Sequence, residues 1–170
     1  MKAQGKASAQ YSLVTLQDMM LRREQRALTQ QQLIRRHGCP VLSFTMNIAG
    51  PIKRSPLIDR GFALALRRIS RVLKGAGIEI AEEVLVLEAT GCEMLCACYA
   101  DALALKRQAV ILELQDTFGR LMDADVLDVN GQRIGRDNLG MPPRRCLLCD
   151  APAVLCGRTR RHPLNELTEA

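Results

Sequence analysis

The segment from Gly119 to Gly131 constrains the fold most, because it has the pattern of a β-strand that runs into a tight turn. Asp123 and Asp125 are two residues apart, so in an extended chain both side chains point to one face of the strand. The apolar residues beside them point to the other face, as in a half-buried strand. Asn130-Gly131 is typical of a two-residue type I′ hairpin, which predicts a return strand at 133–134. The segment therefore predicts an antiparallel sheet.

Other segments supply the rest of an α+β domain. A helix is predicted from about Thr15 to Arg36, because Thr15 and Asp18 resemble a capping box and Gly38 can end the helix. A second helix should begin at Ser55-Pro56 and end near Gly75, with Ser as N-cap and Pro at the first helical position. Between these helices, alternating apolar residues from Val41 to Ile48 predict a strand.

The second half of the chain is predicted to contain mostly strands. We expect strands over Ile78–Ile80, Val84–Leu87, Met94–Tyr99 and Gln108–Leu114, and a brief helix over Asp101–Arg107. Together these elements predict an α+β fold with two main helices and a mostly antiparallel sheet of about five or six strands.

A chain of 170 residues with 48% hydrophobic residues can form a single domain with a substantial core. We expect a flexible N-terminus over residues 1–12 and one domain over 13–170, which ends in a segment rich in Cys and Arg over 142–170. Aromatic residues make up only 3% of the chain, so stacking surfaces for single-stranded nucleic acid are scarce.

The net charge of +6 suits an anionic partner, although a basic surface also serves solubility. No apolar run reaches the length of a transmembrane helix, and Met1 to Gln10 lacks the apolar core of a signal peptide. We therefore expect a cytoplasmic protein that does not engage a membrane and whose seven cysteines are mostly reduced.

The acidic strand is the first candidate site. Two carboxylates side by side repel each other unless a cation or a proton lies between them, and Mg²⁺ is the usual cation where phosphates react. Upstream, Gly119 permits close backbone approach and Arg120 can bind a phosphate through two hydrogen bonds. Asp123 and Asp125 are thus predicted Mg²⁺ ligands, and Glu113, Asp116 and Asp128 are further acidic residues close to them in sequence. The alternative is a solvated strand face without a ligand.

Basic residues are spread over several predicted loops and the first helix. Lys53, after the turn at Gly50-Pro51, is the best candidate among them for holding a ligand. The polar face of the first helix carries five arginines, Arg22, Arg23, Arg26, Arg35 and Arg36.

The seven cysteines fall mainly into two clusters. Cys146, Cys149, Cys156 and His162 have the spacing C-x2-C-x6-C-x5-H, which can form a zinc site. We favour the alternative that these cysteines pack as small apolar residues within a helix, because Leu147-Leu148 and Val154-Leu155 suit a buried helix face. The second cluster, Cys92, Cys96 and Cys98, is predicted to pack in the core.

Four blocks of the sequence resemble one family, the holo-acyl-carrier-protein synthase of citrate lyase, also called apo-citrate lyase phosphoribosyl-dephospho-CoA transferase. The blocks are Arg23-Glu24-Gln25-Arg26; Val41 to Lys53, with Ser43-Phe44 and Gly50-Pro51-Ile52-Lys53; Gly119 to Leu127; and Pro143 to His162, with Arg144-Arg145-Cys146-Leu147-Leu148-Cys149. They span nearly the whole chain in the same order. The segment from Glu79 to Lys106 departs from the pattern.

The resemblance implies a nucleotidyltransferase-type enzyme. Members of the family transfer phosphoribosyl-dephospho-CoA from triphosphoribosyl-dephospho-CoA to a serine of the citrate lyase acyl carrier subunit, and they release pyrophosphate. With that reaction in mind, we expect Asp123 and Asp125 to bind Mg²⁺ and Glu113 to act as base. The triphosphate would be held by cationic residues and a close-approaching glycine, namely Lys53, Arg120, Gly119, Arg23, Arg26, Arg144 and Arg145.

An acidic carrier protein would dock on a basic surface, and the first helix offers one. Two alternatives remain open at this stage. One is a small zinc-containing module that binds nucleic acid, which the Arg-rich Cys/His tail favours and the shortage of aromatic residues opposes. The other is the same transfer onto the carrier of a different enzyme, such as malonate decarboxylase.

Overall fold

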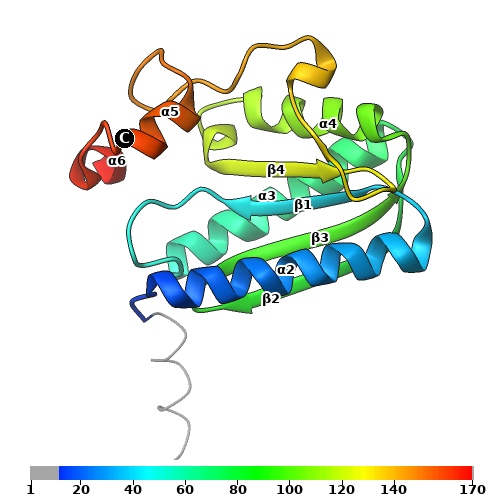
Figure 1. The fold of residues 1–170 in the computed structure, drawn as a ribbon, viewed down its shortest axis with the longest axis horizontal. Coiled ribbons are helices and arrows are strands. Elements are labelled where there is room, and N and C mark those ends of the chain that lie inside the picture. Colours follow the sequence, from blue (N-terminus) through cyan, green and yellow to red (C-terminus); the bar gives the residue numbers. More distant parts are fainter. Residues whose placement is uncertain (1–11, 170) are drawn as a thin grey trace, which may run out of the picture.

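The computed structural model describes residues 12–169 of the chain, so the predicted flexible segment over 1–12 lies, apart from Ser12, outside the described residues. Five strands form one antiparallel sheet in the order β2-β3-β1-β4-β5, which confirms the predicted α+β class (Figure 1). The elements in chain order are α2 (Leu16–His37), β1 (Val41–Met46), α3 (Pro56–Gly75), β2 (Glu79–Glu88), β3 (Gly91–Tyr99), α4 (Ala102–Leu114), η1 (Phe118–Leu121), β4 (Met122–Leu127), β5 (Arg133–Ile134), η2 (Asp137–Leu139), α5 (Ala153–Thr159) and α6 (Leu164–Glu169).

The helix ends follow the predicted caps. Thr15 and Asp18 form the capping box at the start of α2, and Gly38 ends the helix in the left-handed conformation with φ of 63°. The Ser55 side chain accepts a hydrogen bond from the backbone N–H of Ile58 at the start of α3, where Pro56 is the first helical residue. Each cap satisfies backbone groups that a helix end would otherwise leave unpaired.

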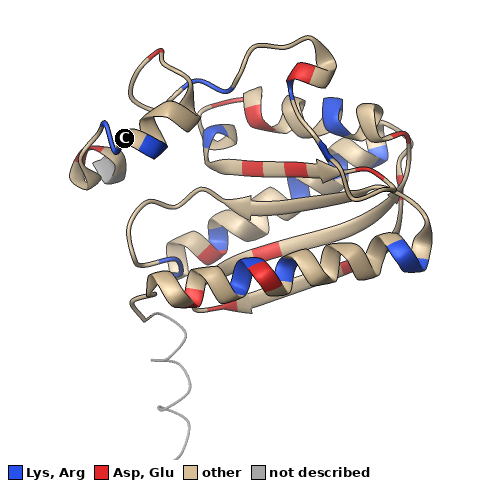
Figure 2. Cartoon of the chain, in the orientation of Figure 1, with Lys and Arg blue, Asp and Glu red and all other residues tan. Residues whose placement is uncertain are grey.

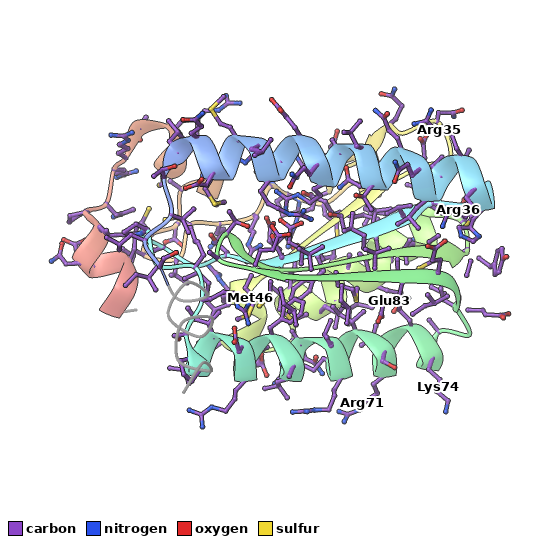
Figure 3. The ribbon with its side chains drawn as sticks, turned by 90° about the horizontal axis from the view of Figure 1, so that it is seen from below. Arg35, Arg36, Met46, Arg71, Lys74 and Glu83 are labelled. Carbon is purple, nitrogen blue, oxygen red and sulfur yellow. The ribbon has the colours of Figure 1, made fainter. Side chains whose placement is uncertain are left out.

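The sheet separates two apolar layers (Figure 3). On one face, α3 and α4 pack on the alternate strand residues that include Leu42, Phe44 and Ala124. Phe44 stacks on Phe62 of α3 with ring centroids 5.6 Å apart. On the other face, the C-terminal part of α2 packs through Leu33 and Ile34. The outer surface of α3 carries basic side chains such as Arg71 and Lys74, which Figure 3 shows pointing away from the sheet.

One of the predicted strands is wrong. The segment over Gln108–Leu114 is part of the single helix α4, not a strand, and it continues the helix predicted over Asp101–Arg107. Asp101 caps this helix through hydrogen bonds from the backbone N–H groups of Leu103 and Ala104. Residues 105, 109 and 112 then lie on one helical face and pack in the core. The run is apolar and short, so its sequence pattern cannot distinguish a buried helix from a buried strand.

The hairpin lies where the sequence predicts it, but its turn differs. Asn130 does not have the positive φ that a type I′ turn needs, whereas Gly131 has φ of 77°. The side chain of Asp128 accepts hydrogen bonds from the backbone N–H groups of Asn130 and Gln132, which favours a three-residue turn. Two further strand predictions, Ile78–Ile80 and Val84–Leu87, merge into β2, which has an irregularity between Ile80 and Glu82.

The strand faces position the acidic residues. In β4, Met122, Ala124 and Val126 face α3 and α4, so Asp123 and Asp125 lie on the face that α2 shares. Figure 1 shows α2 lying along β2 and β3, with β1 between these strands and β4. Within the described residues, no helix combines the length and the apolar character that a membrane span needs.

Candidate active site

A polar cleft lies between α2 and the sheet, next to the acidic strand. Its volume is about 440 Å³. Its lining includes polar and charged side chains from α2, three strands and the loop after β1, namely Arg23, Arg26, Gln30, Ser43, Thr45, Asn47, Lys53, Glu93, Asp123 and Asp125. Figure 2 shows the acidic positions within β4 and β3 and the basic positions on α2 that contribute to this region. Five of the residues singled out from the sequence are therefore brought together, Asp123, Asp125, Lys53, Arg23 and Arg26.

The alternation of β1 and β4 builds the floor of the cleft. Ser43 pairs with Asp125 and Thr45 pairs with Asp123 in the antiparallel register, so each carboxylate has a hydroxyl-bearing residue as its cross-strand neighbour. Since Phe44 lies between these hydroxyl residues and points into the opposite core, the floor can be polar without weakening the packing below it.

The two carboxylates differ in their surroundings. Asp125 Oδ1 accepts hydrogen bonds from Arg133 Nε at 3.0 Å and from Nη2 at 2.7 Å. Asp123 Oδ1 lies 3.7 Å from Arg144 Nη1, which is an ion-pair distance without a hydrogen bond. Burial and the neighbouring carboxylate of Asp125 raise the pKa of Asp123. The pair thus has the mutual repulsion that a bound cation would relieve.

The opposite wall of the cleft is cationic. Lys53 Nζ donates a hydrogen bond to the backbone carbonyl of Ile48 at 2.6 Å. Burial and the nearby guanidinium of Arg23 lower the pKa of Lys53. Arg23 and Arg26 are three residues apart, so both lie on the same side of α2. This wall can bind an anion, and an anion beside Lys53 would restore the pKa of its amine.

A buried ion pair that the sequence analysis missed holds α2 beside the cleft. Glu93 Oε2 accepts hydrogen bonds from Arg22 Nε at 3.0 Å and Nη2 at 2.7 Å. Both residues are buried, with 7% of Arg22 and 4% of Glu93 exposed. The prediction that Arg22 lies on the polar face of the helix is wrong. The signal that could have revealed the pair is Glu93 itself, an acidic residue in a run of otherwise apolar residues in β3.

Glu113 lies at the outer edge of β4 rather than in the cleft. Because β5 pairs only with Val126 and Leu127, side chains satisfy the backbone of the rest of this edge. The N–H of Ala124 donates to Glu113 Oε1 at 3.2 Å, and Lys106 Nζ donates to the carbonyl of Ala124 at 3.0 Å. Glu113 Oε2 also accepts a hydrogen bond from Arg136 at 2.5 Å.

Gly119 and Arg120 likewise contact protein groups. A Cβ at Gly119 would lie 2.6 Å from the carbonyl oxygen of Leu112, so this glycine permits η1 to approach the backbone at the end of α4. The guanidinium of Arg120 donates to the carbonyls of Cys146 at 2.5 Å and Arg145 at 3.3 Å. Arg145 itself is exposed and forms an ion pair with Asp150 at 2.9 Å.

Arg144 connects the C-terminal segment to the acidic strand. Its Nη1 donates to the carbonyl of Met122 at 2.9 Å, and its Nη2 donates to the carbonyl of Arg120. The same guanidinium lies 3.8 Å from Glu113 and 3.7 Å from Asp123. Arg144 therefore adds positive charge next to the cleft although it is not among the residues that line it.

The C-terminal cysteines and histidine come together in space. The ligand atoms of Cys146, Cys149, Cys156 and His162 all lie within 4.8 Å of one another, so this group could hold a metal ion. Residues 146–149 form a loop, not the apolar helix that our preferred packing interpretation assumed. Burial raises the pKa of the Cys146 thiol, but backbone N–H groups and neighbouring thiols outweigh it and bring the pKa to about 7. The other cluster, Cys92, Cys96 and Cys98, packs in the core as predicted.

Comparison with known proteins supplies a function for relatives of this chain. Residues 14–170 match the family model for apo-citrate lyase phosphoribosyl-dephospho-CoA transferase. A Vibrio cholerae protein named as a probable apo-citrate lyase phosphoribosyl-dephospho-CoA transferase is 35% identical over 155 residues, which cover 91% of this chain and 87% of the relative. Proteins of Shigella boydii and Escherichia coli O157:H7, named as apo-citrate lyase phosphoribosyl-dephospho-CoA transferases, are each 33% identical over 159 residues, or 94% of this chain and 87% of the relative.

Proposed function

The chain belongs to the apo-citrate lyase phosphoribosyl-dephospho-CoA transferase family, and on this premise we propose that the cleft between α2 and the sheet is its active site. The protein is a transferase that attaches the phosphoribosyl-dephospho-CoA prosthetic group to apo-citrate lyase. In our proposal the donor is triphosphoribosyl-dephospho-CoA and the acceptor is a serine of the acyl carrier subunit. We set aside the alternative of a module that binds nucleic acid, because the family is one of transferases.

The reaction joins a serine oxygen to the phosphorus nearest the ribose. The new bond forms between the serine oxygen and this phosphorus, while the bond from the same phosphorus to the bridging oxygen breaks. Pyrophosphate leaves with the bonding electron pair, and the serine proton passes to a base. Negative charge therefore accumulates on the leaving oxygens, so fixed cations around the triphosphate lower the barrier.

One observation supports the cleft as the place for this reaction: cations and paired carboxylates line the same cavity. Arg23, Arg26 and Lys53 line the cleft together with Asp123 and Asp125. In this proposal the three cations bind the triphosphate. The lowered pKa of Lys53 supports the assignment, because an amine that is partly buried and close to another cation gains most from a bound anion.

We propose Mg²⁺ as the ion that the Asp123 and Asp125 carboxylates hold. Mg²⁺ prefers oxygen ligands and is commonly held by one or two carboxylates together with substrate phosphates, so a pair is a sufficient protein contribution. Burial and, after it, the neighbouring carboxylate of Asp125 raise the pKa of Asp123, and a bound cation would offset both effects. When bound, the ion would neutralise charge on the leaving pyrophosphate. Arg133, which now pairs with Asp125, would have to release that carboxylate.

Glu113 and Arg120 act as positioning residues in this proposal. Glu113 is the predicted base, but both of its carboxylate oxygens already contact protein groups: Oε2 pairs with Arg136, and Oε1 accepts a hydrogen bond from the backbone N–H of Ala124 in β4. Arg120 was a predicted triphosphate ligand, but its guanidinium bonds to carbonyls of the C-terminal segment. Both residues therefore support Arg144 and the strand that carries the carboxylates.

The carrier protein would approach from the side of the cleft that α2 forms. Acyl carrier proteins are typically acidic, and the exposed Arg23 and Arg35 of α2 give them a basic surface. We also propose a cytoplasmic location, which the seven cysteines support because none of them forms a disulfide.

Intact-mass measurement of the carrier subunit tests the proposal. The apo carrier is incubated with the protein, Mg²⁺ and triphosphoribosyl-dephospho-CoA, and a mass gain equal to phosphoribosyl-dephospho-CoA is expected. Asp125→Asn should slow the gain at least about 100-fold, as the loss of a group that stabilises transition-state charge commonly does. Glu79→Gln is the matched control, because it removes one exposed carboxylate at the start of β2, where its strand partner is Tyr99 and not a residue of the cleft lining.

The possible outcomes test the transfer reaction and the assignment of its active site separately. Full activity in Asp125→Asn would leave the transfer reaction intact and overturn the Mg²⁺ assignment. No mass gain with the wild-type protein, on a carrier that another family member can load, would contradict the proposed donor and acceptor. A gain on the malonate decarboxylase carrier in place of the citrate lyase carrier would change the acceptor.

A further inference from the structure

The C-terminal segment from Pro142 to His162 contains four metal-ligand side chains that the proposed reaction does not use. Cys149 Sγ lies 3.6 Å from Cys156 Sγ and 3.4 Å from His162 Nε2. Around one tetrahedral Zn²⁺, the usual bond lengths place two sulfurs about 3.8 Å apart and a sulfur and a nitrogen about 3.6 Å apart. The two distances in the structure are therefore close to those of an assembled zinc site.

The local backbone explains why these side chains converge. The N–H of Cys146 donates to the carbonyl of Ala151 at 2.7 Å, and the N–H of Ala153 donates to the carbonyl of Arg144 at 2.8 Å, so residues 144–153 form a short hairpin. Cys146 and Cys149 lie within this hairpin, and Cys156 follows in α5. Arg160, with φ of 48°, then turns the chain so that His162 returns to the cluster.

His162 is oriented as a metal ligand. Its Nε2 faces Cys149, while its Nδ1 lies 4.0 Å from a carboxylate oxygen of Glu166. A ligating histidine commonly has a carboxylate near its second ring nitrogen, which orients the ring and makes it a better donor. The histidine and its carboxylate partner therefore match the arrangement around a bound ion.

The segment also lacks an apolar core of its own. Over the described side chains of 142–167, the buried hydrophobic residues are two cysteines, Cys146 and Cys156. Val154, Leu155 and Leu164 are each about half exposed. A short segment that buries so little apolar surface needs another source of stability, and a structural metal is a common one.

We propose that Cys146, Cys149, Cys156 and His162 bind one Zn²⁺ ion and that this ion fixes the C-terminal segment against β4, with Arg144 beside Asp123. Three thiolates and one imidazole are soft or borderline ligands, so the site selects Zn²⁺ over Mg²⁺ or Ca²⁺. All four positions of a tetrahedral ion are then filled by the protein, which is typical of a structural site rather than a catalytic one.

Contacts on both sides of Cys146 connect this site to the cleft. The carbonyl of Cys146 accepts a hydrogen bond from Arg120 at 2.5 Å. Arg144, two residues before Cys146, bonds to the carbonyls of Met122 and Arg120 and lies 3.7 Å from Asp123. Loss of the ion would therefore release Arg144 from β4. This second part of the proposal rests on the proposed active site, whereas metal binding itself does not.

Metal content and Co²⁺ spectroscopy test the binding without any substrate. The full chain, purified under reducing conditions from medium that contains zinc, should hold one Zn²⁺ per chain by elemental analysis. After removal of the zinc, Co²⁺ should bind one per chain and give the thiolate-to-cobalt charge-transfer band and the strong visible bands of a tetrahedral site. A wild-type protein without zinc and without these cobalt bands would overturn the proposal.

Two variants compare a cysteine that is a proposed ligand with a cysteine outside the site. Cys149→Ser should weaken Co²⁺ binding by at least roughly 10–100-fold. Metal affinity falls by this factor when a residue that only hydrogen-bonds to a ligand is mutated, and loss of the ligand itself should cost no less. Cys39→Ala is the matched control, because Cys39 is a buried cysteine of the α2 side of the sheet and should leave metal binding unchanged. Equal metal binding in both variants would contradict the assignment of Cys149.

Hydrogen exchange tests the link to the cleft. Zinc removal should speed amide exchange within 144–162 and at the edge of β4 near Met122, while exchange in α3 should stay unchanged. If the segment exchanges faster but the edge of β4 does not, the zinc site stands and its role in positioning Arg144 is wrong. Neither result depends on the transferase assay, so a failure of the proposed function would be seen separately.

Discussion

Arg22→Met tests how α2 is held next to the cleft. Arg22, Leu33 and Ile34 are the buried residues of this helix, and the two apolar ones lie in its C-terminal part. The ion pair between Arg22 and Glu93 is therefore the main buried contact of the part that carries Arg23 and Arg26. Methionine keeps much of the volume of the arginine stem but leaves the Glu93 carboxylate buried without its two short hydrogen bonds.

The size of the effect follows from the contacts that remain. Removing one partner of a buried ion pair typically costs about 3–5 kcal/mol, because the other charge stays buried. Arg26 Nη1 lies 3.6 Å from Glu93 and can compensate in part, so we expect the low end, a loss of about 3 kcal/mol in the free energy of unfolding. For a chain of this size, that loss lowers Tm by roughly 6–12 °C.

Urea unfolding of three variants provides the assay. Arg22→Met should show the full loss, and Arg22→Met/Glu93→Met should recover most of it, because an apolar pair replaces the buried charges. Arg35→Met, an exposed arginine of the same helix, is the control and should change stability by less than about 0.5 kcal/mol. A loss below about 1 kcal/mol in Arg22→Met, with an unchanged KM for the donor, would refute the view that this pair holds the helix.

Two further predictions concern the cleft and its support. Binding of pyrophosphate in alkaline buffer should be accompanied by proton uptake, because the anion raises the lowered pKa of Lys53 towards its ordinary value. Calorimetry in buffers of different ionisation enthalpy should detect this uptake, and Lys53→Met should abolish it. Gly119→Ala should destabilise the protein by about 1–3 kcal/mol in urea unfolding, because its Cβ would meet the backbone of α4, whereas Gly75→Ala, with open space around its Cβ, should be neutral or stabilising. A loss in the free energy of unfolding that is no larger in Gly119→Ala than in Gly75→Ala would contradict the packing argument.

Local sequence patterns predicted a large part of the fold. Thr15 with Asp18 and Ser55 with Pro56 marked two helix starts correctly, because a cap depends on residues within one helical turn. The alternation around Phe44 predicted a strand and its buried face for the same reason. The helix α4 was missed in part, because its apolar run faces the core and lacks the periodicity of an exposed helix.

The candidate site was predicted where it depends on one strand. Asp123 and Asp125 share a face because a strand alternates with a period of two, whatever the rest of the fold does. Lys53, Arg23 and Arg26 were recognised as candidates, but their convergence on the carboxylates depends on α2 lying on the same face of the sheet as the acidic pair.

The sequence by itself thus determined the caps, the strand faces and the paired carboxylates, since each follows from neighbours a few residues apart. Tertiary structure alone decided the contact of Arg22 with Glu93, which lie 71 positions apart, and the place of Glu113 at the outer edge of β4. It also decided that Cys146, Cys149, Cys156 and His162 converge. The physical reason is that strand order and helix packing set distances between remote residues, and no local pattern of side chains encodes those distances.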